Sequence, residues 1–101
     1  MKKKGFVKFK GSESKGAMHY VEFEGDYVSI TRNSSRKVKD INRKATLNVT
    51  FGLLSRDFKE VSVSIIEEIN HVKKVFNFMK NLKHTHYKEY PDDLVVLKYK
   101  L

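Results

Sequence analysis

Hydrophobic and polar residues alternate through much of this chain, and the alternation predicts β-strands. Residues 45–51 show it most clearly, with Ala45, Leu47, Val49 and Phe51 on one face. Residues 58–66 repeat the pattern through Val61, Val63 and Ile65. Successive side chains of a strand point to opposite faces, so these residues are expected in a core. Similar runs predict strands at residues 6–10, 17–24, 27–31 and 94–101, with turns at residues 11–16 and 24–26.

The spacing of apolar residues changes near Asn70, and the new period predicts a helix. Val72, Val75, Phe76, Met79 and Leu82 follow at intervals of three and four, so Asn70 is expected to cap a helix over residues 70–82. Val38 and Ile41 begin a shorter apolar stripe after the third strand. The elements predict a mainly β (α+β) fold, a six-stranded antiparallel barrel with two helices that plug its openings.

Composition limits the classes of protein that fit. The 101 residues suffice for one domain, residues 1–101. The net charge of +9 suits polyanionic or phosphorylated partners, although lysine also serves solubility. Cysteine is absent from the sequence, which excludes disulfides and zinc–thiolate sites. No apolar run is long enough to span a membrane, and residues 1–5 do not start a signal peptide, so we expect a cytoplasmic protein.

The strand ending at Thr31 leads into a segment with the chemistry of a phosphate site. A helix N-terminus offers free N–H groups and the positive end of a dipole, to which hydroxyls and cations add. An ordinary helix cap followed by a solvated basic face is the alternative. The candidate residues are Ile30, Thr31, Ser34, Ser35, Arg36 and Lys37.

This order of strand, Gly-Asp turn, strand, Ser-Ser-Arg-Lys segment and short helix resembles the FMN-binding split-barrel proteins related to pyridoxamine 5′-phosphate oxidase, including the general-stress-protein branch. The resemblance is densest over residues 20–51, and residues 60–63 resemble the family's next core strand. It implies that Arg36 and Lys37 hold the FMN phosphate with Ser34 or Ser35. It further implies that Ile30 and Thr31 flank the ribityl chain and ring. Glu60 stands about where the oxidase has a glutamine near the flavin.

Three departures from the family pattern qualify what the resemblance implies. Only residues 1–5 precede the first strand, where the family usually has a helix, and residues 18–23 lack the oxidase's phosphate-binding arginine and lysine. The oxidase's C-terminal extension has no counterpart. Pyridoxamine-phosphate oxidation is therefore not expected. The implied function is a homodimeric, FMN-dependent oxidoreductase of unknown small-molecule substrate, with F420 and haem as other cofactors to consider.

Two other functions remain open on the sequence. A degenerate split barrel without a cofactor could act as a dimeric interaction protein. A basic barrel could bind nucleic acid by stacking bases on aromatic side chains. The alternation of the aromatics suits a core, and no RNA-recognition signature occurs, so nucleic acid is disfavoured. The aromatics in question are Phe6, Phe9, Tyr20, Phe23 and Tyr27.

The histidines give a weaker signal. His84 and His86 could place two imidazoles on one side of an extended segment, as some metal sites do. The nearest further ligands are Glu89, Asp92 and Asp93. Without cysteines nearby, a solvated loop is the expectation, and no metal is predicted.

Overall fold

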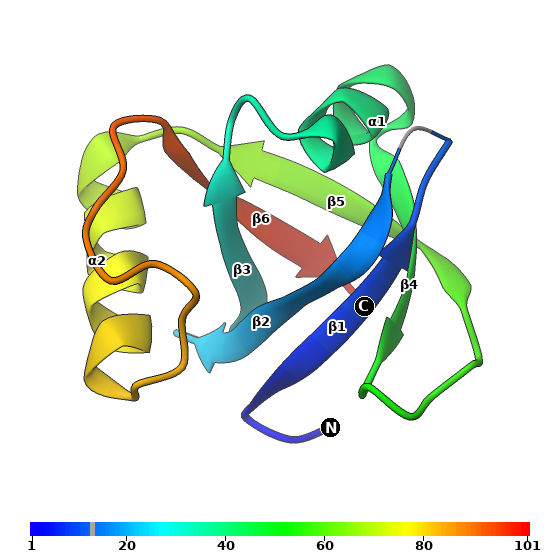
Figure 1. Ribbon diagram of the computed structural model, residues 1–101, viewed down its shortest axis with the longest axis horizontal. Coiled ribbons are helices and arrows are strands. Elements are labelled where there is room, and N and C mark those ends of the chain that lie inside the picture. The colour runs from blue at the N-terminus through cyan, green and yellow to red at the C-terminus, as the bar shows by residue number, and fades with distance from the viewer. Residues whose placement is uncertain (13) are drawn as a thin grey trace.

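The computed structural model describes residues 1–12 and 14–101, which form a closed antiparallel barrel of six strands with two helices (Figure 1). The strands follow the order β1-β2-β3-β6-β5-β4 around the barrel. This confirms the predicted fold. The elements are β1 (Lys4–Lys10), β2 (Lys15–Phe23), β3 (Asp26–Arg32), α1 (Arg36–Lys44), β4 (Thr46–Phe51), β5 (Lys59–Ile66), α2 (Ile69–Asn81) and β6 (Leu94–Lys100).

The inward faces of the strands form the first of two hydrophobic cores. Helix α1 closes one opening of the barrel, because Val38 and Ile41 belong to this core. Of the six predicted core residues on β4 and β5, three are buried and three are partly buried against the core. The buried ones are Leu47, Val49 and Val63, and the partly buried ones are Phe51, Val61 and Ile65.

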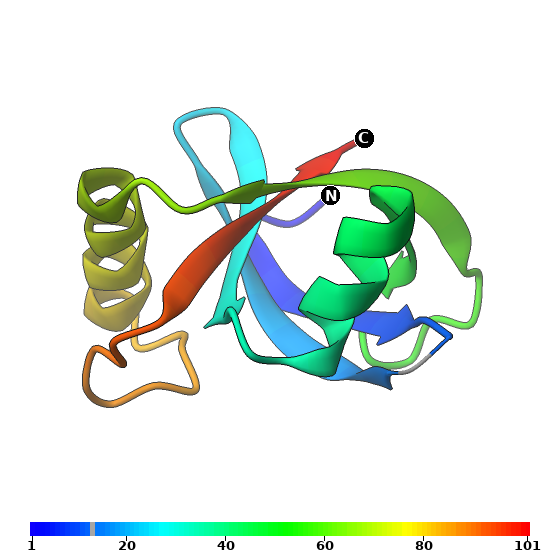
Figure 2. The same ribbon diagram turned by 90° about the horizontal axis from the view of Figure 1, so that it is seen from above.

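Helix α2 lies on the outer surface of the barrel and covers a second core (Figure 2). Val72, Val75, Phe76 and Met79 pack there against the outward side chains of β2, β3 and β6. The prediction that both helices plug barrel openings is therefore wrong for α2. The physical reason is that β6 carries apolar residues on both faces and β3 carries Val28 and Ile30 on its outward face, so these outer faces must also be buried. The outward residues are Val21, Val28, Ile30, Leu94 and Val96.

Two helix boundaries differ from the predictions. Helix α2 begins at Ile69, and the carboxylate of Glu68 accepts a hydrogen bond of 2.6 Å from the His71 backbone N–H. Glu68 is therefore the N-cap, whereas Asn70 lies within the first turn. Ala45 is exposed and ends α1 in the left-handed conformation at φ 58° instead of starting the inward face of β4. The predicted turn over residues 11–16 is shortened because β2 starts at Lys15, and Glu13 lies outside the described residues.

The segment between α2 and β6, residues 82–93, packs on the barrel more closely than a solvated loop. The His84 Nε2–H donates to the Gly5 carbonyl at 2.7 Å. Tyr87 and Tyr90 are partly buried against the second core. In the described part of the chain, no cluster of three or more potential ligands could hold a metal, and no helix is long and apolar enough to cross a membrane.

Candidate cofactor site

The barrel is split between β2 and β3. These strands pair over only three positions, from Val21 with Val28 to Phe23 with Asp26, and then diverge. A side chain bridges them beyond that point, because the Ser29 hydroxyl donates to the His19 carbonyl at 2.7 Å. The hydroxyl of Tyr99 in turn donates to Ser29 Oγ at 2.9 Å. A side-chain hydrogen bond thus joins the two strands at the split, where the backbone ladder has ended.

A cavity of about 320 Å³ occupies the split. Its wall is mainly apolar and aromatic, and the polar side chains that line it among the described residues carry hydroxyl, imidazole and ammonium groups and no carboxylate. Such a lining suits a flat, partly polar ring. The lining residues are Phe6, Ala17, Met18, His19, Ile30, Thr31, Lys37, Leu53, Met79, Thr85, His86 and Tyr87.

Three histidines lie at or beside this split cavity. The rings of His19 and His84 meet edge to face with centroids 4.5 Å apart, and Phe6 packs on His19 at 4.6 Å. Burial, followed by the nearby His84 and His86, lowers the pKa of His19. His19 is consequently held as a neutral imidazole in the cavity wall at neutral pH.

A second cavity, of about 560 Å³, lies between the β1–β2 hairpin and the N-terminus of α1. We call it the cationic cavity, because the charged side chains lining it among the described residues are lysine and arginine. Ser35 is the N-cap of α1, yet its side chain makes no capping hydrogen bond. The start of α1 therefore has no side-chain cap from Ser35, and a helix N-terminus in that state suits an anion. The lining residues are Phe9, Lys10, Gly11, Ser12, Ser14, Lys15, Arg36 and Lys37.

The buried carboxylate of Asp40 fixes the hairpin against α1. It accepts hydrogen bonds from Ser12 Oγ and Ser14 Oγ, each at 2.7 Å. A Cβ at Gly11 would overlap the same carboxylate, so the hairpin approaches this closely only because residue 11 is a glycine. Asp40 therefore sets the distance between the two walls of the cationic cavity.

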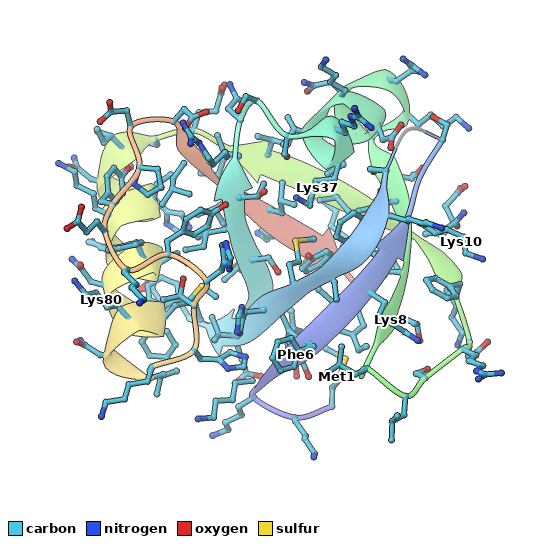
Figure 3. The ribbon with its side chains drawn as sticks, viewed as in Figure 1. Met1, Phe6, Lys8, Lys10, Lys37 and Lys80 are labelled. Carbon is cyan, nitrogen blue, oxygen red and sulfur yellow. The ribbon has the colours of Figure 1, made fainter. Side chains whose placement is uncertain are left out.

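Lys37 lines both cavities and points between β2 and β3 (Figure 3). Its Nζ donates to Thr31 Oγ1 at 3.0 Å and lies 5.0 Å from the centre of the Phe9 ring. Burial lowers the pKa of the Lys37 ammonium. The Thr31 hydroxyl also lies 3.4 Å from Ser35 Oγ, which links the end of β3 to the start of α1.

The predicted site residues lie around the two cavities that Lys37 joins, with two exceptions. Ile30 and Thr31 are buried at the split cavity, and Ser35, Arg36 and Lys37 lie at or beside the cationic cavity. The Ser34 hydroxyl instead donates to Asp93 Oδ2 at 3.1 Å.

Glu60 is the second exception. It lies on β5 at a separate cavity of about 300 Å³, with Arg43 and Lys44. Within this chain, the structure does not bring Glu60 together with the other predicted residues.

Asp93 explains the position of Ser34. Its Oδ1 accepts from Arg32 Nε at 2.7 Å, and its backbone carbonyl accepts from the Asn33 N–H at 2.7 Å. The hydrogen bonds from Arg32 and Ser34 hold the pKa of Asp93 below its ordinary value. An ionised carboxylate beside Ser34 would repel a phosphate, so Ser35 is the better phosphate ligand of the two.

Sequence reasoning missed the hairpin wall, Asp40 and the histidines as parts of the site. Lys15 and Asp40 carry no local signal, because only the long-range approach of α1 to the hairpin brings them to the cavity. His19 had a detectable signal, since a histidine on an otherwise apolar strand face is unusual. His86 was missed because its segment was predicted to be a solvated loop.

These features define a split barrel with a cation-lined cavity beside the split. No protein-family description and no curated relative matches the sequence. Among solved structures, the chain is similar to a protein assigned as pyridoxamine 5′-phosphate oxidase from Listeria innocua, with TM-score 0.63, 15% identity and coverage of 98% of this chain and 83% of that one. The fold resemblance inferred from the sequence is therefore confirmed.

Two further solved structures share the fold. General Stress Protein 26 from Bacillus anthracis aligns with TM-score 0.62 and 21% identity over 99% of this chain and 80% of that one. A NimC/NimA family protein from Clostridium acetobutylicum aligns with TM-score 0.59 and 11% identity over 97% and 73%. At such identities the likeness concerns the fold, and function must be argued from the site.

Proposed function

We propose that this chain is an FMN-binding split-barrel protein and acts as a flavin-dependent oxidoreductase on a small molecule that is not yet known. The observation that carries the proposal is the junction of the cationic cavity with the split cavity through one side chain, Lys37. A ligand with a phosphate at one end and a flat ring at the other would place the phosphate in the cationic cavity and the ring in the split cavity.

The residues present fit the two ends of FMN. Arg36, Lys37, Ser35 and the α1 N-terminus would hold the phosphate by charge-assisted hydrogen bonds. Ile30 and the other apolar walls of the split cavity would enclose the ring. FMN itself would supply hydride and electron transfer, and the protein would orient it and limit its contact with water.

The decisive experiment is a titration with FMN, followed by flavin absorbance and fluorescence. Each charged contact to the phosphate contributes about 1.5–3 kcal/mol, so Arg36→Ala with Lys37→Ala should weaken FMN at least about a hundredfold. Lys39→Ala with Lys44→Ala is the matched control, because it removes two exposed cations from the same helix. It should leave the affinity nearly unchanged.

Riboflavin separates the phosphate contacts from the ring contacts. It lacks the phosphate, so it should bind the natural protein weakly and respond little to the double substitution. Equal FMN affinity in the natural protein and the Arg36/Lys37 variant would exclude the proposed phosphate site.

A cofactor-free barrel that acts as a dimeric interaction protein is the second candidate. The observation in its favour is the apolar exposure of the β4–β5 loop, where the Leu54 side chain is 96% exposed. This candidate predicts a stable dimer that binds neither FMN nor riboflavin. Localisation in the cytoplasm stays a prediction under either candidate.

A further inference from the structure

Lys37 differs from the exposed cations around it. Within the described residues, its ammonium contacts a neutral hydroxyl, Thr31 Oγ1 at 3.0 Å, and the face of Phe9 at 5.0 Å, and it has no carboxylate within ion-pair distance. By contrast, the ammonium of Lys10 turns away from Lys37 toward Phe58, 4.6 Å from the ring centre (Figure 3). Lys37 is thus a partly desolvated amine at the meeting point of two cavities.

Among the described residues, the titratable groups that line the two cavities with Lys37 are cations, imidazoles and the phenol of Tyr87. Arg36 lies beside it on α1, and Lys15 lies across the cationic cavity on β2. His19 of β2 and His86 of the loop after α2 line the split cavity. None of these groups is a carboxylate that would stabilise the ammonium form. Desolvation and nearby cations together are the usual means of making a lysine nucleophilic.

We propose that the Lys37 ε-amine forms a reversible imine with an aldehyde that carries an anionic group, the anion being bound in the cationic cavity. The neutral amine attacks the carbonyl carbon and gives a carbinolamine. The carbinolamine then loses water, so the C=N bond replaces the C=O bond and the two amine hydrogens leave with the carbonyl oxygen. The step needs no oxidant or reductant. Arg36 and the α1 N-terminus would bind the anion and hold the aldehyde beside Nζ.

The proposal goes beyond flavin binding and does not depend on it. An imine at Lys37 would occupy the position proposed for the FMN phosphate, so the two ligands should compete. FMN titration therefore tests the proposed function, and imine trapping on the same protein samples tests the reactivity of Lys37. Flavin binding without trapping would overturn this inference alone, and trapping without flavin binding would overturn the proposed function alone.

The test uses 4-formylbenzenesulfonate below one equivalent, with cyanoborohydride to reduce the imine and peptide mass spectrometry to locate it. Label at Lys37 should exceed label at exposed Lys39 at least about tenfold, as one charged contact to the sulfonate allows. It should also appear at lower pH than label at Lys39, since burial lowers the pKa of Lys37. The neutral analogue 4-methylbenzaldehyde should lose most of this selectivity.

Two conservative variants complete the test. Lys37→Arg keeps the charge but removes the nucleophile, so selective label should disappear, while Lys39→Arg should leave it unchanged. Circular dichroism of both variants checks that the barrel is intact. Label spread evenly over the lysines of the natural protein would overturn the proposal. So would undiminished total label from 4-formylbenzenesulfonate in Lys37→Arg.

Discussion

Asp40 shows how a single buried charge can shape a cavity that it does not line. The residue is 5% exposed, and its carboxylate accepts hydrogen bonds from both serines of the β1–β2 turn. Breaking a buried charge's contacts is costly, so the hairpin and α1 are expected to move as one unit. Gly11 is the residue that permits the close approach.

Gly11→Ala should therefore destabilise the protein by about 1–3 kcal/mol, the usual cost of overpacking a close contact. The free energy of unfolding from urea titration measures this. The control is a double-mutant cycle with Asp40→Ala, because removing the carboxylate removes the overlap. The two substitutions should couple by about 0.5–3 kcal/mol. If the two changes in the free energy of unfolding were simply additive, the Asp40 carboxylate would not be what restricts residue 11 to glycine.

At the residue scale, the sequence identified those site residues that are close together in the chain. Thr31, Ser35, Arg36 and Lys37 span one strand end and one helix start, so local rules place them near each other. Asp93 could not be predicted at the site because it lies just before β6, sixty-one residues from its partner Arg32. No local rule predicts contacts over such separations.

Helix α2 illustrates what periodicity reveals and what it leaves open. The three- and four-residue spacing correctly identified the buried face, on which Val72 and Val75 are fully buried. It could not identify the surface that this face covers. That information lies in β6, where Leu94 to Leu97 are all buried and thus need cover on both sides of the sheet. The N-cap was missed because glutamate is an uncommon cap beside asparagine.

Phe76→Ala should cost about 3–5 kcal/mol, because the side chain is 4% exposed in the second core. Phe78 on the same helix is the matched control. It is 36% exposed, so Phe78→Ala should cost much less. Chemical denaturation midpoints at constant m-value report both changes. Equal losses would mean that α2 packs in a different rotation.

At the scale of the whole molecule, we expect the positive charge to serve solubility and not a nucleic-acid interface. Of the aromatics considered for base stacking, Phe9 and Tyr20 are buried in the barrel core. Phe23 and Tyr27 pack against the two cores. Phe6, the remaining candidate, packs on His19 at 4.6 Å in the wall of the split cavity. Stacking on bases needs exposed aromatic faces, so these positions favour a packing role for the five side chains.

The β4–β5 loop bears on assembly because of its two leucines. Leu54 is 96% exposed and Leu53 is 51% exposed, and Leu53 also lines the split cavity. Adjacent exposed leucines beside a cavity suit a surface that a partner covers. We propose a second copy of the chain as that partner, which would add a wall to the cofactor site.

The protein should accordingly sediment as a dimer at micromolar concentration, with an interface of at least about 1,200 Å². Leu54→Glu would place a charge in that interface, so it should shift the equilibrium to monomers and weaken FMN in parallel. Asn77→Glu on the exposed face of α2 is the control and should change neither. One chain would complete the site if the natural protein sedimented as a monomer and Leu54→Glu left its FMN affinity unchanged. Loss of the dimer with full FMN affinity would separate assembly from cofactor binding.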